Sequence, residues 1–250
     1  MAGSLDGRRI AITGASSGIG EATALAMARE GAAVALGARR ADRLEELKGR
    51  IEGDGGSAVA LAVDVTDEPS AHHFIHASHE AMGGLDGLIN NAGVMLLGPI
   101  EGADTDQWRQ MVNVNLLGLL YSTQAALPLL RHADGSDIVN VSSVAGRVAN
   151  PGSAVYNLTK WGVVGFSEAL RKEVGSAGIR VTCVEPGFVD TELQGHNENP
   201  VVKEAIENMR DQIGEVLTAE DIARAIVYVV SQPQRVSINE VLIRPTGQAR

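Results

Sequence analysis

The sequence predicts one α/β domain over residues 1–250, with a doubly wound parallel sheet of seven strands and helices on both faces. Two observations lead to this prediction. Short apolar segments alternate with longer segments of helical periodicity along the whole chain. The short segments are apolar at nearly every position, which is typical of parallel strands buried on both faces. No low-complexity linker or internal repeat divides the chain, so we expect a single domain.

Seven segments rich in Val, Ile, Leu and Ala are expected to form the strands. They cover residues 9–13, 33–38, 58–63, 85–90, 137–142, 179–185 and 240–244. Helical patterns fill most of the gaps between them. They cover residues 18–30, 41–52, 68–82, 105–131, 154–175, 202–213 and 219–231. Strands that alternate with helices in this way are joined by crossover connections, which make neighbouring strands parallel.

Three local signals refine these boundaries. Gly31 stands where the C-cap of the first helix is expected. The segment "TAED" from Thr218 resembles a capping box, with Asp in place of the usual Glu. The irregular stretch 187–201 breaks the alternation of strands and helices, and we expect a flexible flap around 187–214 that covers a site.

Composition and charge exclude several classes of function. The net charge of −10 argues against a nucleic-acid partner or an anionic membrane, because both require basic surfaces. The uncharged segment 111–130 is long enough to span a bilayer, but its Asn, Gln and Pro residues favour a buried helix. The first ten residues lack an apolar stretch of signal-peptide length. The single cysteine, Cys183, allows no internal disulfide, so we expect a cytoplasmic protein with Cys183 as a buried spectator.

A glycine-rich segment, "TGASSGIG" at 13–20, follows the first strand and opens the first helix. Gly14, Gly18 and Gly20 allow a sharp turn and a close approach to a pyrophosphate, which the helix N-terminus attracts. The spacing G-x-x-x-G-x-G departs from the G-x-G-x-x-G of many Rossmann-type folds, and the lysine of a P-loop is absent. A plain strand–helix turn is the alternative interpretation. We favour dinucleotide binding over nucleotide triphosphate hydrolysis.

The end of the second strand indicates which dinucleotide is bound. NAD-binding units carry an acidic residue here, which accepts from the ribose 2′-hydroxyl. This chain has Ala38, Arg39 and Arg40 instead, with no carboxylate before Asp42. A guanidinium suits a 2′-phosphate, so we predict NADP as the cofactor, with Arg39 the preferred contact. The alternative is a solvated basic turn at the start of a helix.

A serine, a tyrosine and a lysine in the segment 141–160 suggest acid–base chemistry. Within a helix, Tyr156 and Lys160 are i,i+4 neighbours, and a cation near the phenol would lower its pKa from about 10 towards neutrality. Ser143 lies at the carboxyl end of a strand, where ligands of open α/β sheets bind. A Tyr–Lys pair on the surface is the alternative. Because the glycine loop meets the same edge of the sheet, we favour a catalytic site.

These motifs together resemble the short-chain dehydrogenases/reductases, in the single-domain branch of about 250 residues. The resemblance extends over almost the whole length and is carried by separated motifs in the expected order. They are "TGASSGIG" (13–20), "DV" (64–65), "NNAG" (90–93), "NVNLLG" (113–118), "VSS" (141–143), "YNLTK" (156–160) and "EPG" (185–187). A narrower likeness, carried by "NNAGVMLLGP", "EPGFVDTEL" and a following "GH", is to the subgroup that contains clavulanic acid dehydrogenase.

The resemblance implies four catalytic residues. Tyr156 would exchange a proton with the substrate oxygen, and Lys160 would hold the nicotinamide ribose and lower the pKa of Tyr156. Ser143 would orient the carbonyl, and Asn115 would anchor a water that links Lys160 to solvent.

Two of these assignments have a close competitor in the sequence. Ser142 competes with Ser143, but alternate strand residues face opposite sides, and the 13-residue spacing to Tyr156 favours Ser143. Asn113 competes with Asn115, and the following "LLG" favours Asn115.

The loops and the resemblance together imply a set of residues around NADP. They are Gly14, Ser16, Ser17, Gly18, Ile19, Gly20, Ala38, Arg39, Arg40, Asp64, Val65, Asn91, Ala92, Gly93, Tyr156, Lys160, Pro186, Gly187, Val189 and Thr191. Candidates for the substrate pocket, chosen by proximity to the motifs, are Met95, Leu96, Arg147, Asn150, Phe188 and His196. Two departures from the family pattern stand out: Glu185 before "PG", which would alter the polarity near the nicotinamide, and the ending "VLIRPTGQ", which puts the family's C-terminal contacts in doubt.

The predicted function is therefore an NADP-dependent carbonyl reductase or alcohol dehydrogenase that acts on a small-molecule carbonyl or alcohol substrate. The alternatives are an NAD-linked alcohol dehydrogenase of the same family and a non-catalytic dinucleotide-binding protein. The spacing of His72, His76 and His79 permits a metal site, but a solvated helix face is favoured and no metal is expected. The apolar surplus of 105–131 and 154–175 and the resemblance imply a homo-oligomer, either a dimer or a tetramer, through these helices.

Overall fold

The computed structural model describes residues 3–133 and 135–249, and it confirms the doubly wound parallel sheet. The strands are β1 (Arg9–Thr13), β2 (Ala33–Ala38), β3 (Ser57–Ala62), β4 (Gly87–Asn90), β5 (Ser136–Val141), β6 (Ile179–Pro186) and β7 (Glu240–Ile243). Their order is β3-β2-β1-β4-β5-β6-β7, and every neighbouring pair is parallel. The direction of winding reverses between β1 and β4, which places the ligand crevice at the carboxyl ends of these strands.

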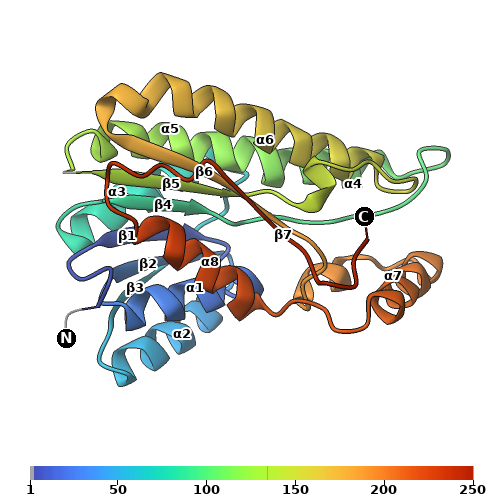
Figure 1. Ribbon diagram of the computed structural model, residues 1–250, viewed down its shortest axis with the longest axis horizontal. Coiled ribbons are helices and arrows are strands. Elements are labelled where there is room, and N and C mark those ends of the chain that lie inside the picture. The colour runs from blue at the N-terminus through green and yellow to red at the C-terminus, as the bar shows by residue number, and fades with distance from the viewer. Residues whose placement is uncertain (1–2, 134, 250) are drawn as a thin grey trace.

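Helices cover both faces of the sheet, as predicted (Figure 1). They are α1 (Gly18–Arg29), α2 (Ala41–Gly53), α3 (Glu68–Met82), α4 (Thr105–Val112), α5 (Gly118–Leu130), α6 (Ala154–Val174), α7 (Pro200–Ile213) and α8 (Ala219–Val230). One face packs against α1, α2 and α8, and the other against α3, α5 and α6. Helix α7 stands apart from the sheet, at the right of the view in Figure 1, and α4 packs against α6 and the segment Asn113–Leu117.

Alternation along each strand supplies both halves of the core. In β1, Ile10 and Ile12 pack with α1 and α8, whereas Ala11 between them packs with the helices of the other face. All three side chains are fully buried. The strands are therefore apolar on both faces at most positions, because each face has its own layer of helices. Cys183 in β6 is also buried, as expected, and burial raises the pKa of its thiol to about 12, so it stays an unreactive thiol.

The predicted boundaries agree with the structure to within two residues, and one predicted helix is wrong in form. The segment 105–131 is not one continuous α-helix, because a turn of π-helix, Asn113–Leu117, separates α4 from α5. The capping box at Thr218 is present, with hydrogen bonds in both directions between Thr218 and Asp221. Gly31 adopts a positive φ of 92° directly after the first helix. No helix in residues 3–133 and 135–249 is long and apolar enough to cross a membrane.

The segment that follows β6 forms the predicted flap region. It contains a short 3-10 turn, Glu192–His196, and then α7, in which no residue is buried. A parallel bridge between Val189 and Leu217 joins the two ends of the segment. The flap therefore leaves the body of the domain and returns to it at the same place. The C-terminal residues lie next to this place (Figure 1).

Candidate active site

A cavity of about 850 Å³ opens at the carboxyl ends of the strands. Its walls come from the loops after β1, β2, β4, β5 and β6, from α7 and from the C-terminal tail. Nearly every predicted cofactor contact lines this cavity. Gly20 is the exception: a Cβ on Gly20 would lie 2.3 Å from the carbonyl oxygen of Gly14, so this glycine allows the turn to close but lies beneath it.

The glycine loop is shaped for close approach by a ligand. Gly14 and Gly18 have positive φ values of 68° and 56°, which other residues adopt only at a cost. A Cβ on Gly14 would lie 2.8 Å from Cα of Ala92, so the glycine loop also packs tightly against the loop after β4. Helix α1 begins at Gly18 and points its free N–H groups into the cavity. These features fit a dinucleotide pyrophosphate.

Basic residues occupy the corner of the cavity after β2. Arg39 is exposed, and no hydrogen bond to its guanidinium is found within the described part of the chain. Arg40 donates to the hydroxyls of Ser16 (2.9 and 3.1 Å) and Ser17 (2.8 Å), and to Glu192 Oε2 (2.8 Å). Asp64, after β3, accepts from the backbone and hydroxyl of Thr66, and these hydrogen bonds lower its pKa, with a further contribution from the charge of Arg39. The predicted preference for Arg39 stays a prediction.

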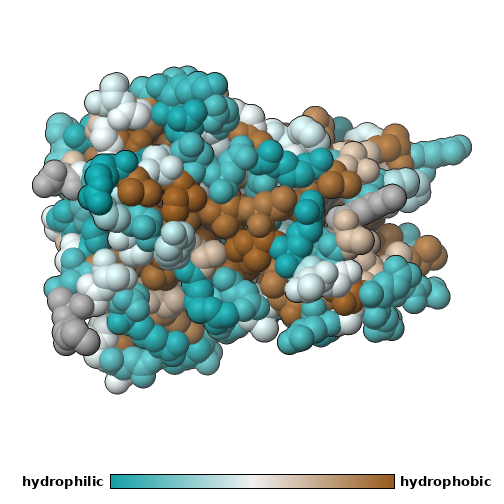
Figure 2. Space-filling model, viewed as in Figure 1, coloured by the Kyte–Doolittle hydropathy of each residue, from teal (hydrophilic) through white to brown (hydrophobic). Residues whose placement is uncertain are grey.

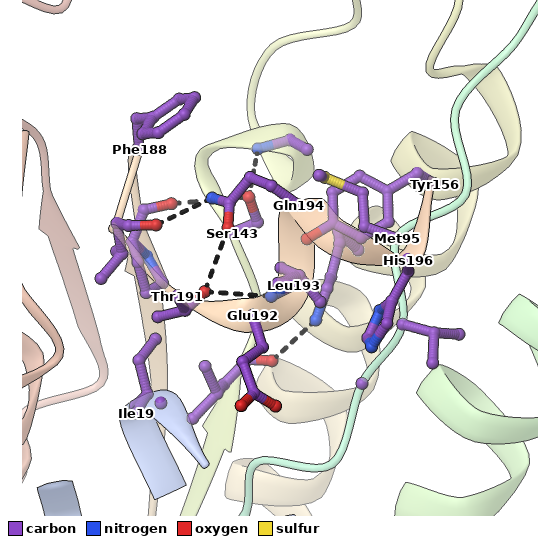
Figure 3. A pocket seen from close by; sticks show the side chains of 18 of the residues that line it. Ile19, Met95, Ser143, Tyr156, Phe188, Thr191, Glu192, Leu193, Gln194 and His196 are labelled. Atoms are coloured by element: carbon purple, nitrogen blue, oxygen red, sulfur yellow. Dashed lines mark hydrogen bonds between the residues drawn. The ribbon is translucent and has the colours of Figure 1, made fainter. Parts of the chain in front are cut away.

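The two neighbouring serines face different surroundings, as predicted. Ser142 is buried, and its hydroxyl donates to the carbonyl oxygen of Lys160 (2.9 Å). The Ser143 hydroxyl accepts from the backbone N–H of Ala145 (3.1 Å) at the start of a 3-10 turn and also lies close to the Tyr156 phenol. Figure 3 shows Ser143 and Tyr156 at the wall of the cavity beneath the flap residues Leu193 and Gln194.

Tyr156 and Lys160 are both buried, and burial controls their protonation. Burial raises the pKa of Tyr156 to about 12, and the interaction with Ser143 opposes this only in part. The expected lowering of the Tyr156 pKa by Lys160 is wrong for the chain on its own. The ammonium lies 5.7 Å from the ring centroid and donates to Val141 O (3.0 Å), while burial lowers the Lys160 pKa to about 8. The lysine is itself short of solvation and contributes little to a phenolate.

Lys160 should consequently cost the protein stability. Its pKa falls from 10.5 to about 8 on folding, so folding disfavours the charged form at pH 7. We expect Lys160→Met to raise the free energy of unfolding at pH 7 by about 2 kcal/mol, after about 1 kcal/mol is subtracted for the carbonyl left unpaired. Between pH 8 and 10.5 the unfolded state binds more protons than the folded state, so the stability of the wild type rises with pH. The stability advantage of Lys160→Met over the wild type therefore shrinks, by about 1 kcal/mol at pH 9. Denaturant unfolding at pH 7 and 9 measures both values; a variant less stable than wild type at pH 7 contradicts the expectation.

The π-helical turn positions Asn115. The amide of Asn115 is buried; its oxygen accepts from the backbone N–H of Val94 (2.8 Å), and its nitrogen donates to Val94 O (2.9 Å) and to Thr159 Oγ1 (3.1 Å). Asn113, the competing residue, is exposed. A Cβ on Gly93 would lie 3.5 Å from Asn115 Oδ1 and 3.8 Å from Lys160 Nζ, so Asn115 lies directly behind two residues of the cavity wall. Asn115 does not itself line the cavity.

The substrate end of the cavity differs in part from the prediction. Met95, Asn150, Phe188 and His196 line it, whereas Leu96 does not. Further lining residues come from the flap, α7 and the tail, and the sequence analysis missed them: Leu193, Gln194, Ile206, Met209, Gln212, Ile213, Gly247, Gln248 and Ala249. The sequence signal that could have identified the lining residues of α7 is a stripe of apolar residues at helical spacing, on a helix that does not pack against the sheet.

Arg147 and Glu185 form an ion pair with each other, and neither residue lines the cavity. Glu185 is fully buried, and Arg147 Nε donates to both of its carboxylate oxygens (2.8 and 3.0 Å). Arg147 Nη2 also pairs with Glu240 Oε2 (2.5 Å). The predicted place of Arg147 in the substrate pocket is therefore wrong, as is the expected effect of Glu185 on the cavity, because each charge neutralises the other behind Ser143.

The C-terminal tail holds the start of the flap. The Gln248 side-chain oxygen accepts from the backbone N–H of Phe188 (2.8 Å). A Cβ on Gly187 would lie 2.3 Å from the same oxygen, so only glycine admits this contact. Asn197, at the other end of the 3-10 turn, is buried and joins the flap to the loop after β4 through Leu97 N (2.7 Å) and Met95 O (3.1 Å).

The histidines of α3 lie outside this site. His72 Nε2 lies 3.1 Å from Gln124 Oε1. Within residues 3–133 and 135–249, no three His, Cys, Asp or Glu side chains gather in a way that could hold a metal ion.

Comparisons with known proteins agree with this geometry. A family model of short chain dehydrogenases matches residues 8–201. An uncharacterized oxidoreductase of Staphylococcus saprophyticus is 40% identical over 242 residues, 96% of each chain. The closed form of a serine dehydrogenase complexed with NADP+ has a TM-score of 0.88 at 30% identity, over 96% of both chains. A 3-ketoacyl-(acyl-carrier-protein) reductase from Brucella melitensis complexed with NADH has a TM-score of 0.84 at 28% identity, over 97% of this chain and 99% of that chain.

Proposed function

Because the chain belongs to the short chain dehydrogenase family and is an oxidoreductase, we propose that it transfers a hydride between NADP(H) and a carbonyl or secondary alcohol. The single observation that carries this proposal is the meeting of Ser143, Tyr156 and Lys160 in one cavity with the glycine loop. A binding protein without catalysis has no need of a buried phenol and a buried ammonium beside its ligand, since burial of both is costly.

The nicotinamide, when bound, supplies or accepts the hydride. Tyr156 exchanges the proton with the substrate oxygen, and the Ser143 hydroxyl donates to that oxygen as its charge develops. Because burial keeps the Tyr156 phenol protonated at neutral pH, the residue is ready to act as the proton donor of a reduction. Lys160 donates to Val141 O, and Asn115 holds the backbone of Val94, whose side chain packs with Tyr156.

The substrate end of the cavity favours an uncharged compound of small or medium size. Its walls are largely apolar, and its polar side chains are amides, a serine and His196. Burial, together with the cations of Arg39 and Arg40, lowers the pKa of His196, so this ring is neutral at physiological pH. The charged side chains of the described lining are Arg39, Arg40, Asp64, Lys160 and Glu192, and none of them is among the residues that we assign to the substrate end.

Direct titration tests the proposed cofactor. We expect the purified protein to bind NADPH more tightly than NADH, because two guanidinium groups lie at the corner after β2. Arg39→Asp should weaken NADPH binding selectively, by about tenfold or more, since an attraction to the 2′-phosphate is replaced by a repulsion. Quenching or enhancement of dinucleotide fluorescence measures both constants. Equal or tighter binding of NADH by the wild type would favour the NAD-linked alternative, and binding of neither would favour a different function.

We also propose that copies of the chain associate through exposed apolar surfaces. Leu158 and Trp161 of α6 are 63% and 50% exposed, next to Leu120 of α5. Figure 2 shows a second hydrophobic band across the middle of the face in view, over β7, and Leu242 of this strand is exposed. Surfaces of this kind on a soluble protein are typical of subunit interfaces. Light scattering should give two or four times the chain mass of 26.2 kDa.

A further inference from the structure

The flap brings a carboxylate to the basic corner of the cavity. Glu192 Oε2 accepts from Arg40 Nη1 (2.8 Å), and Glu192 Oε1 accepts from Arg43 Nη1 (2.7 Å). The two arginines thus share one carboxylate, with one oxygen each. Their hydrogen bonds lower the pKa of Glu192 to about 2, so the group is charged at every physiological pH.

Neighbouring contacts hold Glu192 in this place. The preceding residue, Thr191, packs on the glycine loop, where a Cβ on Gly18 would lie 3.2 Å from the Thr191 side chain. The Thr191 hydroxyl also caps the 3-10 turn by accepting from the backbone N–H of Leu193 (3.4 Å). Figure 3 shows the Glu192 carboxylate pointing away from Tyr156, and its two oxygens accept from Arg40 and Arg43.

We propose that Glu192 sets the selectivity between NADP and NAD, because its carboxylate competes with the 2′-phosphate for Arg40 and Arg43. The inference rests on the proposed dinucleotide function and adds to it a residue outside the predicted cofactor set. The inference is also supported by the absence of a carboxylate at the end of β2. NAD-binding units use a carboxylate at that strand end, this chain has Ala38 there, and Glu192 brings a carboxylate to the same corner from the flap.

The hydrogen-bond geometry makes the competition direct. Arg40 already donates from all three guanidinium nitrogens, to Ser16, Ser17 and Glu192. A phosphate that binds Arg40 through Nη1 therefore either displaces Glu192 or shares the cation with it, and both events oppose binding of the phosphate. A ribose hydroxyl carries no charge, so the same carboxylate does not repel it and can accept its hydrogen bond. Glu192 thus weakens binding of the 2′-phosphate and leaves NAD tolerated.

The test is a binding cycle with fragments that differ in the 2′-phosphate. Calorimetry on the full chain would compare adenosine 2′,5′-bisphosphate with AMP, which lacks only the 2′-phosphate, for the wild type, Glu192→Gln and Arg43→Gln. In Glu192→Gln we expect the preference for the 2′-phosphate to rise about fivefold, because one repulsive charge at a half-exposed site is removed. In Arg43→Gln we expect it to fall about threefold or more, because a cation is lost and Glu192 is left to Arg40 alone.

The opposite signs separate this proposal from a purely structural role. If the ion pair only holds the flap in place, both variants break it and both shift binding in the same direction, which would overturn the proposal. Asp190→Asn is the matched control, since Asp190 forms a neighbouring exposed ion pair with Arg210 and does not contact Arg40 or Arg43. We expect it to leave the preference unchanged. Failure of the wild type to bind either fragment would count against the dinucleotide function itself, whereas binding with an unchanged preference in Glu192→Gln would refute only the role of Glu192.

Discussion

Replacing Tyr156 by Phe should lower kcat for carbonyl reduction by about a thousandfold, within the range typical for loss of a general acid. The phenol is the proton donor in the proposed mechanism, and Phe retains the ring that packs against Val94 and Met111. NADPH binding should change by no more than about twofold, since only the hydroxyl is lost. Steady-state kinetics, combined with fluorescence titration of NADPH, would separate the two effects.

A matched control is available in Tyr228→Phe. Tyr228 is exposed on α8, so its hydroxyl has no part in the cavity, and kcat should stay within about twofold of the wild type. The Tyr156→Phe protein should also be at least as stable as the wild type, which thermal unfolding would show. A folded Tyr156→Phe variant with most of its turnover would refute the assigned role.

The second large effect concerns stability rather than chemistry. Replacing Arg147 by Met should lower the free energy of unfolding by about 3–5 kcal/mol, because it leaves the fully buried Glu185 carboxylate without its cation. Glu185 is held by Arg147 through both oxygens, and the same guanidinium reaches Glu240 at the start of β7. Denaturant unfolding, with the midpoint and slope compared, would measure the loss.

Arg171→Met is the control for this prediction. Arg171 also forms a two-nitrogen contact with a carboxylate, that of Glu168, but on the exposed surface of α6. Its loss should cost less than about 1 kcal/mol. Similar losses in the two variants would mean that burial of Glu185 adds nothing to the energy of the pair, which contradicts the argument. Since Arg147 follows the 3-10 turn that Ser143 begins, catalytic rates of Arg147→Met should be measured well below its melting temperature.

The strands and most helices could be predicted because burial leaves a direct trace in the sequence. A strand covered on both faces is apolar at most of its positions, and β1, β2 and β6 show this in "RIAIT", "AVALGA" and "IRVTCVE". The glycine loop could be predicted for a related reason. Gly14 and Gly18 adopt positive φ values, and such positions favour glycine strongly enough to mark the turn.

The failures come from contacts between distant residues. Arg147 was placed in the pocket because it follows Ser143 closely, but its direction is decided by Glu185 and Glu240, which lie on other strands. Glu192 and Gln248 were missed for the same reason, since each acts on a residue more than 50 positions away. The expected lowering of the Tyr156 pKa considered the charge of Lys160 but not the burial of both groups, which only the packed structure reveals.

The π-helical turn Asn113–Leu117 has a consequence for insertions and deletions in this chain. A π-helical turn accommodates one residue more than an α-helix would over the same length. Deleting a single residue there would restore a regular helix and keep both flanking helices, yet it would rotate Asn115 by about 100° away from Val94 and Thr159. A variant that lost this one residue would keep its fold and lose the hydrogen bonds of Asn115 to Val94 and Thr159. The length of the segment, as much as the identity of its residues, is therefore under functional constraint.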